Sequence, residues 1–158
     1  MKTLLLSTTL VVTLGGAAFA GGTHAGGHGH DMMAIGAPAT GDADRTIEVT
    51  MRETEDGAMV FEPAQLDFKA GETVRIVVTN AGEHDHEFVM DSPEKNVEHK
   101  ALMEKFPEME HDDPNAVRLE PGAKGEILWT FANKGTFEFA CLIPGHYDAG
   151  MHGPITVN

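Results

Sequence analysis

Three residues near the end of the chain carry side chains that bind soft metal ions, and they are evenly spaced. Cys141, His146 and Met151 form the pattern Cys-x4-His-x4-Met within FACLIPGHYDAGMHG, and Cys141 is the only cysteine of the chain. Mononuclear copper sites for electron transfer combine two imidazoles and a thiolate with a weak axial methionine. The pattern therefore predicts three of the four ligands of such a copper site.

Two other chemistries of this cysteine account for fewer of the residues. Structural zinc sites commonly use four Cys or His ligands in close pairs, and this chain has no second cysteine. A cysteine nucleophile with His146 as its base is conceivable, but it leaves Met151 without a role. A reactive thiol is also easily oxidised outside the reducing cytoplasm, so copper is the better interpretation.

The second imidazole has two candidates in the stretch HDHEFVM. His84 and His86 both stand at the mouth of a predicted strand, so either could reach the copper ion. The other three ligands are expected on one loop, because a strand ends at Cys141 and Pro144-Gly145 turns the chain back. The residues alone leave the choice between His84 and His86 open.

The elements that position these ligands are predicted to be short strands separated by turns. Alternation of apolar and polar residues predicts strands within TIEVTMRE, MVFEP, QLDFKAGE, ETVRIVVTN, HEFVM, GEILWTF, GTFEFAC and GPITVN. Seven or eight such strands favour an all-β sandwich. The stretch 92–110 instead predicts a short helical insert that starts with Ser92 as N-cap and ends at Pro107. The stretch HDDPNAV is expected to follow it as a loop.

The N-terminal part is predicted to lie outside this domain. Residues 1–20 have the pattern of a secretory signal peptide cleaved after Ala20. Residues 21–44 are rich in Gly and Ala and are expected to be a flexible arm, which leaves 45–158 as the domain. Histidines and methionines of the arm and the insert could bind additional copper ions: His24, His28, His30, Met32, Met33, His99, Met103, Met109 and His111. Incidental histidines and a methionine packed against the sandwich are the alternative.

The formal net charge of −14 restricts the partners. Such acidity argues against nucleic acid and favours metal ions or a basic protein surface, although solubility alone would also explain it. The acidic residues Glu53, Glu55, Asp56, Asp112 and Asp113 lack the spacing of a calcium loop and are expected in solvated loops. Beyond the signal peptide we expect no membrane span, and we expect an exported monomer.

The combined motifs resemble the cupredoxins. In that family the first ligand heads a strand as His-x-apolar-apolar, which corresponds here to His86-Glu87-Phe88-Val89, and Cys-x4-His-x4-Met follows. The resemblance covers roughly 46–158 and implies a Greek-key β-sandwich with a type 1 copper site of His86, Cys141, His146 and Met151. It implies that His84 is an outer residue. Many small cupredoxins have Asn after the first histidine to tie the ligand loops together, so Glu87 puts that hydrogen bond in doubt.

The insert and the His/Met-rich arm make the chain similar to periplasmic copper-tolerance cupredoxins of the CopI type. That resemblance implies a role in surviving excess copper. Two alternatives are a soluble electron carrier that docks a basic redox partner such as a c-type cytochrome, and a small cuprous-ion oxidase with a second, open copper site. A multicopper oxidase is not expected, because Ala140 and Leu142 flank Cys141 where those enzymes have histidines.

Overall fold

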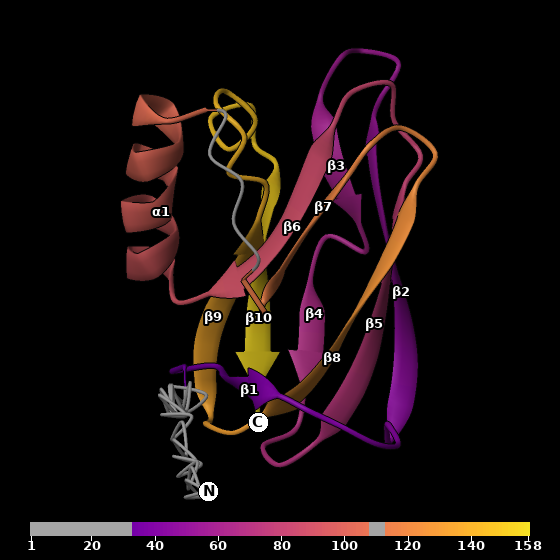
Figure 1. Ribbon diagram of the computed structural model, residues 1–158, viewed down its shortest axis with the longest axis vertical. Coiled ribbons are helices and arrows are strands. Elements are labelled where there is room, and N and C mark those ends of the chain that lie inside the picture. The colour runs from indigo at the N-terminus through magenta and orange to yellow at the C-terminus, as the bar shows by residue number, and fades with distance from the viewer. Residues whose placement is uncertain (1–32, 108–112) are drawn as a thin grey trace, which may run out of the picture.

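The structure is a computed structural model that describes residues 33–107 and 113–158, and two sheets face each other in it (Figure 1). In spatial order the first sheet contains β1 (Gly36–Pro38), β8 (Lys124–Phe131), β5 (Thr73–Asn80), β2 (Arg45–Glu53) and β3 (Met59–Glu62). The second sheet contains β4 (Leu66–Phe68), β10 (His152–Val157), β9 (Gly135–Ala140), β6 (His86–Asp91) and β7 (Ala116–Leu119). The expected all-β sandwich is therefore confirmed.

The inner faces of the sheets follow the predicted alternation. Every second residue of β5 is buried, and Ile76 and Val78 are fully inaccessible. Between the sheets the Phe61 ring packs edge-on against Phe139, with centroids 5.0 Å apart, a favourable aromatic geometry. Trp129 is also fully buried, as its alternation with Phe131 predicts. This core provides the rigid frame on which the ligand-bearing segments are mounted.

Two strands were not expected from the sequence. β1 pairs antiparallel with β8 within the range predicted to be a flexible arm, and Ile35 just before it is fully buried. Gly36 permits this pairing, because a Cβ there would lie 2.0 Å from the Thr130 carbonyl oxygen. β7 occupies the end of the predicted loop HDDPNAV and pairs with β6. The ordered domain thus begins earlier than residue 45, and the described residues contain more strands than the predicted seven or eight.

The predicted helix is present as α1 (Pro93–Lys105), which lies against β6 and β9 (Figure 1). Ser92 is its N-cap and accepts a hydrogen bond from the Lys95 amide at 3.3 Å, as the sequence predicts. The face that it buries is a surprise, because Asn96 and Met103 point inward.

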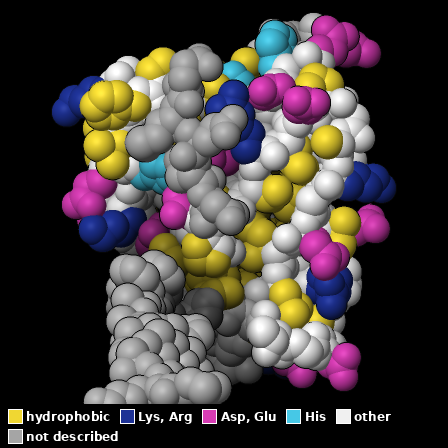
Figure 2. Space-filling model, in the orientation of Figure 1, with side chains coloured by type: hydrophobic (Ala, Val, Ile, Leu, Met, Phe, Trp, Pro, Cys, Tyr) yellow, Lys and Arg dark blue, Asp and Glu magenta, His cyan; other side chains and the backbone are white. Residues whose placement is uncertain are grey.

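The large apolar residues of this segment are instead on its outer side. Val97, Leu102 and Phe106 remain 46–58% exposed, and Figure 2 shows apolar side chains over α1 at the upper left. Within 33–107 and 113–158, no helix combines the length and the apolar character needed to cross a membrane.

Candidate metal centre

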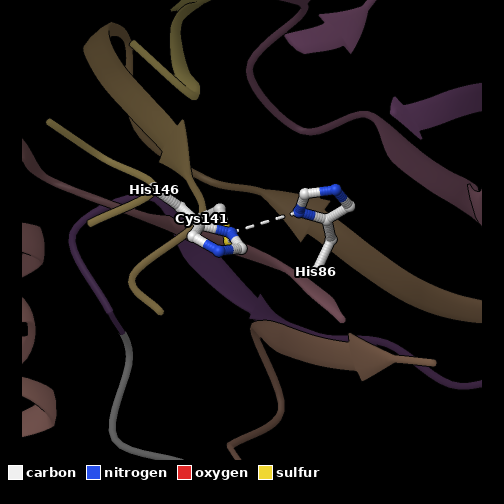
Figure 3. Close-up of side chains that lie close together, drawn as sticks. All are labelled: His86, Cys141 and His146. Atoms are coloured by element: carbon white, nitrogen blue, oxygen red, sulfur yellow. Dashed lines mark hydrogen bonds between the residues drawn. The ribbon is translucent and has the colours of Figure 1, made fainter. Parts of the chain in front are cut away.

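Three predicted ligands converge where strands of the second sheet begin and end. His86 is the first residue of β6, Cys141 directly follows β9, and His146 lies in the loop between β9 and β10 (Figure 3). One ligand atom from each lies within 4.8 Å of the other two. The pairing of β6 with β9 brings His86 close to Cys141 although the two are far apart in the sequence. The amide of Glu87, the residue after His86, donates to the Cys141 sulfur across 54 residues.

The distances between these atoms fit one shared metal ion. His86 Nδ1 lies 3.2 Å from His146 Nδ1, and Cys141 Sγ lies 3.3 Å from His146 Nδ1. Bonds of about 2.0 Å to nitrogen and about 2.3 Å to sulfur, as found at zinc, allow ligand atoms this close together on one ion. Two imidazoles and one thiolate are the in-plane donor set of a type 1 copper site. The residues present therefore fit copper.

Met151 closes the loop beside the other ligands. Its backbone amide donates to the His146 carbonyl at 3.1 Å, and its carbonyl accepts from the Cys141 amide at 3.0 Å. The Met151 side chain is fully buried. Two glycines permit this path, because Gly145 and Gly150 adopt φ angles of 90° and 93° that other residues rarely take. The loop geometry thus agrees with the turn expected at Pro144-Gly145.

The environment of the thiol keeps it protonated until a metal arrives. Burial raises the pKa of Cys141 to about 12, although the Glu87 amide donates to its sulfur at 3.3 Å. A metal must therefore displace the thiol proton, because the thiolate is the ligand form. The Glu87 bond also ties β6 to the cysteine segment through the backbone, so a direct link between the two segments exists although Glu87 stands where the resemblance would place Asn.

The two imidazoles are held in their neutral form. Burial lowers the pKa of His86 and of His146, and their mutual repulsion when charged lowers that of His146 further. A neutral imidazole offers a lone pair on one ring nitrogen, which a metal requires. His86 is fully buried, whereas His146 is partly exposed. The two ligands therefore differ in their access to solvent.

The structure brings His86, and not His84, to the other ligands. The His84 side chain is 62% exposed and its Nδ1 lies 2.7 Å from Glu53 Oε1. The same carboxylate oxygen lies 3.1 Å from Nε2 of His86.

Glu53 is a site residue that the sequence reasoning missed. We expected it in a solvated loop, but it is the last residue of β2 and its side chain is only 17% exposed. Burial alone would raise its pKa, yet hydrogen bonds from the Glu83 amide and the His84 ring, among others, lower the pKa of Glu53 to about 2. The period-two pattern could have revealed it, because Glu53 continues the inward series of Val49 and Met51.

Three of the candidates for a second copper site lie among the described residues. Met33 packs against the hydrophobic core, and Met103 is buried against Val89, Ala140 and Leu142. His99 on α1 is partly buried. The other candidates lie outside the described residues: His24, His28, His30, Met32, Met109 and His111.

Residues next to two of the ligands form a small polar cluster. The Tyr147 ring stacks on the His152 ring with centroids 4.4 Å apart, and the Tyr147 hydroxyl donates to Glu138 at 3.1 Å. Asn96 of α1 also donates to the Glu138 carboxylate, at 3.0 Å. His152 thus belongs to this cluster beside the ligand loop.

Comparisons with known proteins agree with this geometry. Residues 47–158 match the family described as copper binding proteins, plastocyanin/azurin family. A copper-resistant cuproprotein CopI of Rubrivivax gelatinosus is 46% identical over 139 residues, which cover 87% of this chain and 82% of the relative. A protein of the same name from Pseudomonas aeruginosa is 37% identical, with 79% of this chain and 83% of the relative covered.

Among solved structures, auracyanin B has a TM-score of 0.62 at 23% identity and covers 77% of this chain and 94% of its own. The reduced auracyanin of Roseiflexus castenholzii has a TM-score of 0.59 at 26% identity, and the match covers 74% of this chain and 99% of the auracyanin chain.

Proposed function

This chain belongs to the plastocyanin/azurin family of copper-binding proteins, and we propose that it is a periplasmic copper-tolerance protein with one type 1 copper site. The ligands of that site are His86, Cys141, His146 and Met151. The observation that carries the proposal is the convergence of two imidazole nitrogens and one thiol sulfur at 3.2–3.3 Å in a largely buried position.

The side chains divide the work at this site. Copper supplies one-electron chemistry by alternating between Cu(I) and Cu(II). Cys141 gives up its thiol proton and provides the thiolate, while His86 and His146 provide neutral nitrogens. Met151 provides a weak thioether ligand, which suits the softer reduced ion. The buried side chains of Cys141 and Met151 would shield a bound ion from water on their side.

The role in copper tolerance is supported by the name of the relatives, copper-resistant cuproprotein, and by their coverage of most of this chain. We propose that residues 1–20 direct export and that the His/Met-rich arm captures or hands over additional copper ions. Electron carriage is the second candidate, because the partly exposed His146 gives a partner protein access to the site and the net charge of −14 favours a basic one.

Copper titration of the exported protein tests the site. An intense thiolate-to-copper charge-transfer band should appear, and it should be absent from Cys141→Ser. The same band in Cys141→Ser would refute the ligand assignment. Met151→Leu should keep the band but shift it, whereas Met90→Leu, which alters a buried methionine of the core, should leave it unchanged.

Deleting 21–32 separates the two functions. Copper tolerance of cells should fall if the arm handles copper, whereas electron transfer by the purified protein should persist. A titration that ends at one copper ion per chain, together with unchanged tolerance of the deletion strain, would favour the electron carrier.

A further inference from the structure

One carboxylate reaches the copper site from the opposite sheet. Glu53 ends β2 of the first sheet, whereas His86 begins β6 of the second. Their side chains meet at 3.1 Å, between Glu53 Oε1 and His86 Nε2. This contact is on the ring nitrogen that faces away from His146, because His86 Nδ1 is the atom directed at His146. Glu53 and the other proposed ligands thus lie at opposite ends of the same imidazole.

The carboxylate is held in place by a specific cradle. Its Oε2 accepts from the Glu83 amide at 2.8 Å, and its Oε1 accepts from the His84 amide at 3.2 Å. Gly82 leaves room for it, since a Cβ at that position would lie 2.3 Å from Glu53 Oε2. Asn80 fixes the same turn by accepting from the Gly82 amide at 2.9 Å and donating to the His84 carbonyl at 2.7 Å. Two backbone amides therefore aim Glu53 at His86.

The chemistry of this contact determines which nitrogen of His86 can bind a metal. An ionised carboxylate only accepts hydrogen bonds, so the ring nitrogen facing it must carry the proton. The proton is thus on Nε2, and the lone pair is on Nδ1, where the other ligands converge. A carboxylate behind a ligating histidine also increases the basicity of the ligand.

We propose that Glu53 is the positioning residue of this copper site: it fixes the Nε2–H tautomer of His86 and, through its negative charge, stabilises Cu(II) relative to Cu(I). The proposal rests on the proposed function, because it assumes that His86 binds copper. It assigns a role to a residue that contacts no metal and that belongs to neither ligand motif.

The test compares Glu53→Gln with Glu55→Gln in the copper-loaded protein. Gln can still accept a hydrogen bond from His86 but carries no charge, and Glu55 is an exposed acid two residues further along the chain. We expect Glu53→Gln to keep the thiolate band and to weaken Cu(II) relative to Cu(I) about tenfold, which raises the one-electron potential by about 59 mV. Glu55→Gln should leave the potential at the wild-type value.

Equal potentials for the two variants, with the thiolate band of the wild type intact, would overturn the proposal and leave the copper assignment standing. Absence of the band from the wild type would instead refute the copper assignment itself. If Glu53→Gln does not fold, nitrogen NMR of the metal-free wild type decides, because no metal then fixes the tautomer. A proton on Nε2 of His86 supports the proposal, and a proton on Nδ1 overturns it.

Discussion

The two segments that supply the ligands are stabilised in different ways. His86 belongs to a strand that pairs with β7 and β9, and Glu53 holds its ring from the other sheet. Cys141, His146 and Met151 instead lie on one loop, which is supported from outside by α1.

Contacts from α1 reach the ligand loop at both its base and its tip. Met103 shares a buried cluster with Leu142, against which Tyr147 packs. Lys100 Nζ lies 3.1 Å from a carboxylate oxygen of Asp148, a residue between His146 and Met151 in the loop. The strand-borne ligand is therefore held by strand pairing and one carboxylate, whereas the loop-borne ligands are held by hydrogen bonds within the loop and by side chains of α1. Substitutions on the two sides should have separable effects.

The largest expected contrast is between the two histidine ligands. Replacing either one, as His86→Gly or His146→Gly, should abolish the thiolate-to-copper band because the donor set is incomplete. Added imidazole should restore the band of His146→Gly, whose position is partly open to solvent, but not that of His86→Gly, whose position is fully buried. Absorption spectra recorded with and without imidazole measure this, and equal rescue of both variants would contradict the difference in access.

The packing of α1 against the second sheet can be weakened without changing a proposed ligand. Met103→Ala should create a cavity between α1 and the second sheet and lower the free energy of unfolding by about 2–5 kcal/mol. The change should also broaden the spectroscopic features of the loop ligands. Leu102→Ala, a neighbour that is 46% exposed, should change the free energy by no more than about 0.5 kcal/mol. Chemical denaturation measures both, and similar losses would show that α1 does not brace the loop.

The proposed copper ligands could be picked out from the sequence because the information is local or nearly so, although the choice of His86 over His84 rested on the family resemblance. Cys141, His146 and Met151 occupy one loop with a fixed spacing, and His86 heads a recognisable strand. Glu53 was not predictable as a partner of His86, because their contact depends on how two sheets stack across 33 residues of sequence.

The packing of α1 and of β1 also could not be predicted from the sequence. The buried face of α1 contains Asn96, which no apolar pattern marks, since its amide is matched to Glu138 of β9. β1 was missed because a composition rich in Gly and Ala predicts flexibility, while its strand depends on the pairing of Gly36 with Phe131.

A smaller effect is expected from the polar cluster beside the loop. Glu138→Gln keeps the volume but replaces an acceptor that Asn96 and Tyr147 share with a neutral amide. Hydrogen bonds to charged groups contribute about 1.5–3 kcal/mol each, of which a neutral acceptor retains part. We therefore expect a loss of about 1–2 kcal/mol in the free energy of unfolding. Glu120→Gln, at an exposed position, is the control, and an equal loss there would remove the role assigned to Glu138.

The last prediction concerns the pH dependence of the free energy of unfolding, to which both His86 on the strand and His146 on the loop contribute. In the metal-free protein, burial lowers the pKa of His86 and of His146 below the value of about 6.5 expected in the unfolded chain. The unfolded chain therefore binds more protons as the pH falls below about 6.5. Stability is greatest above that pH and declines as the pH decreases, by less than about 1.4 kcal/mol per pH unit for each histidine.

Thermal unfolding of the metal-free protein between pH 7.5 and pH 5.5 measures this decline, and paired variants apportion it. His146→Asn should flatten the pH dependence by removing one of the two contributions, while His86 keeps the other. His86→Asn is its pair and should flatten the slope as well, because it removes the other contribution. A slope as steep in both variants as in the wild type would contradict the contribution assigned to the buried imidazoles.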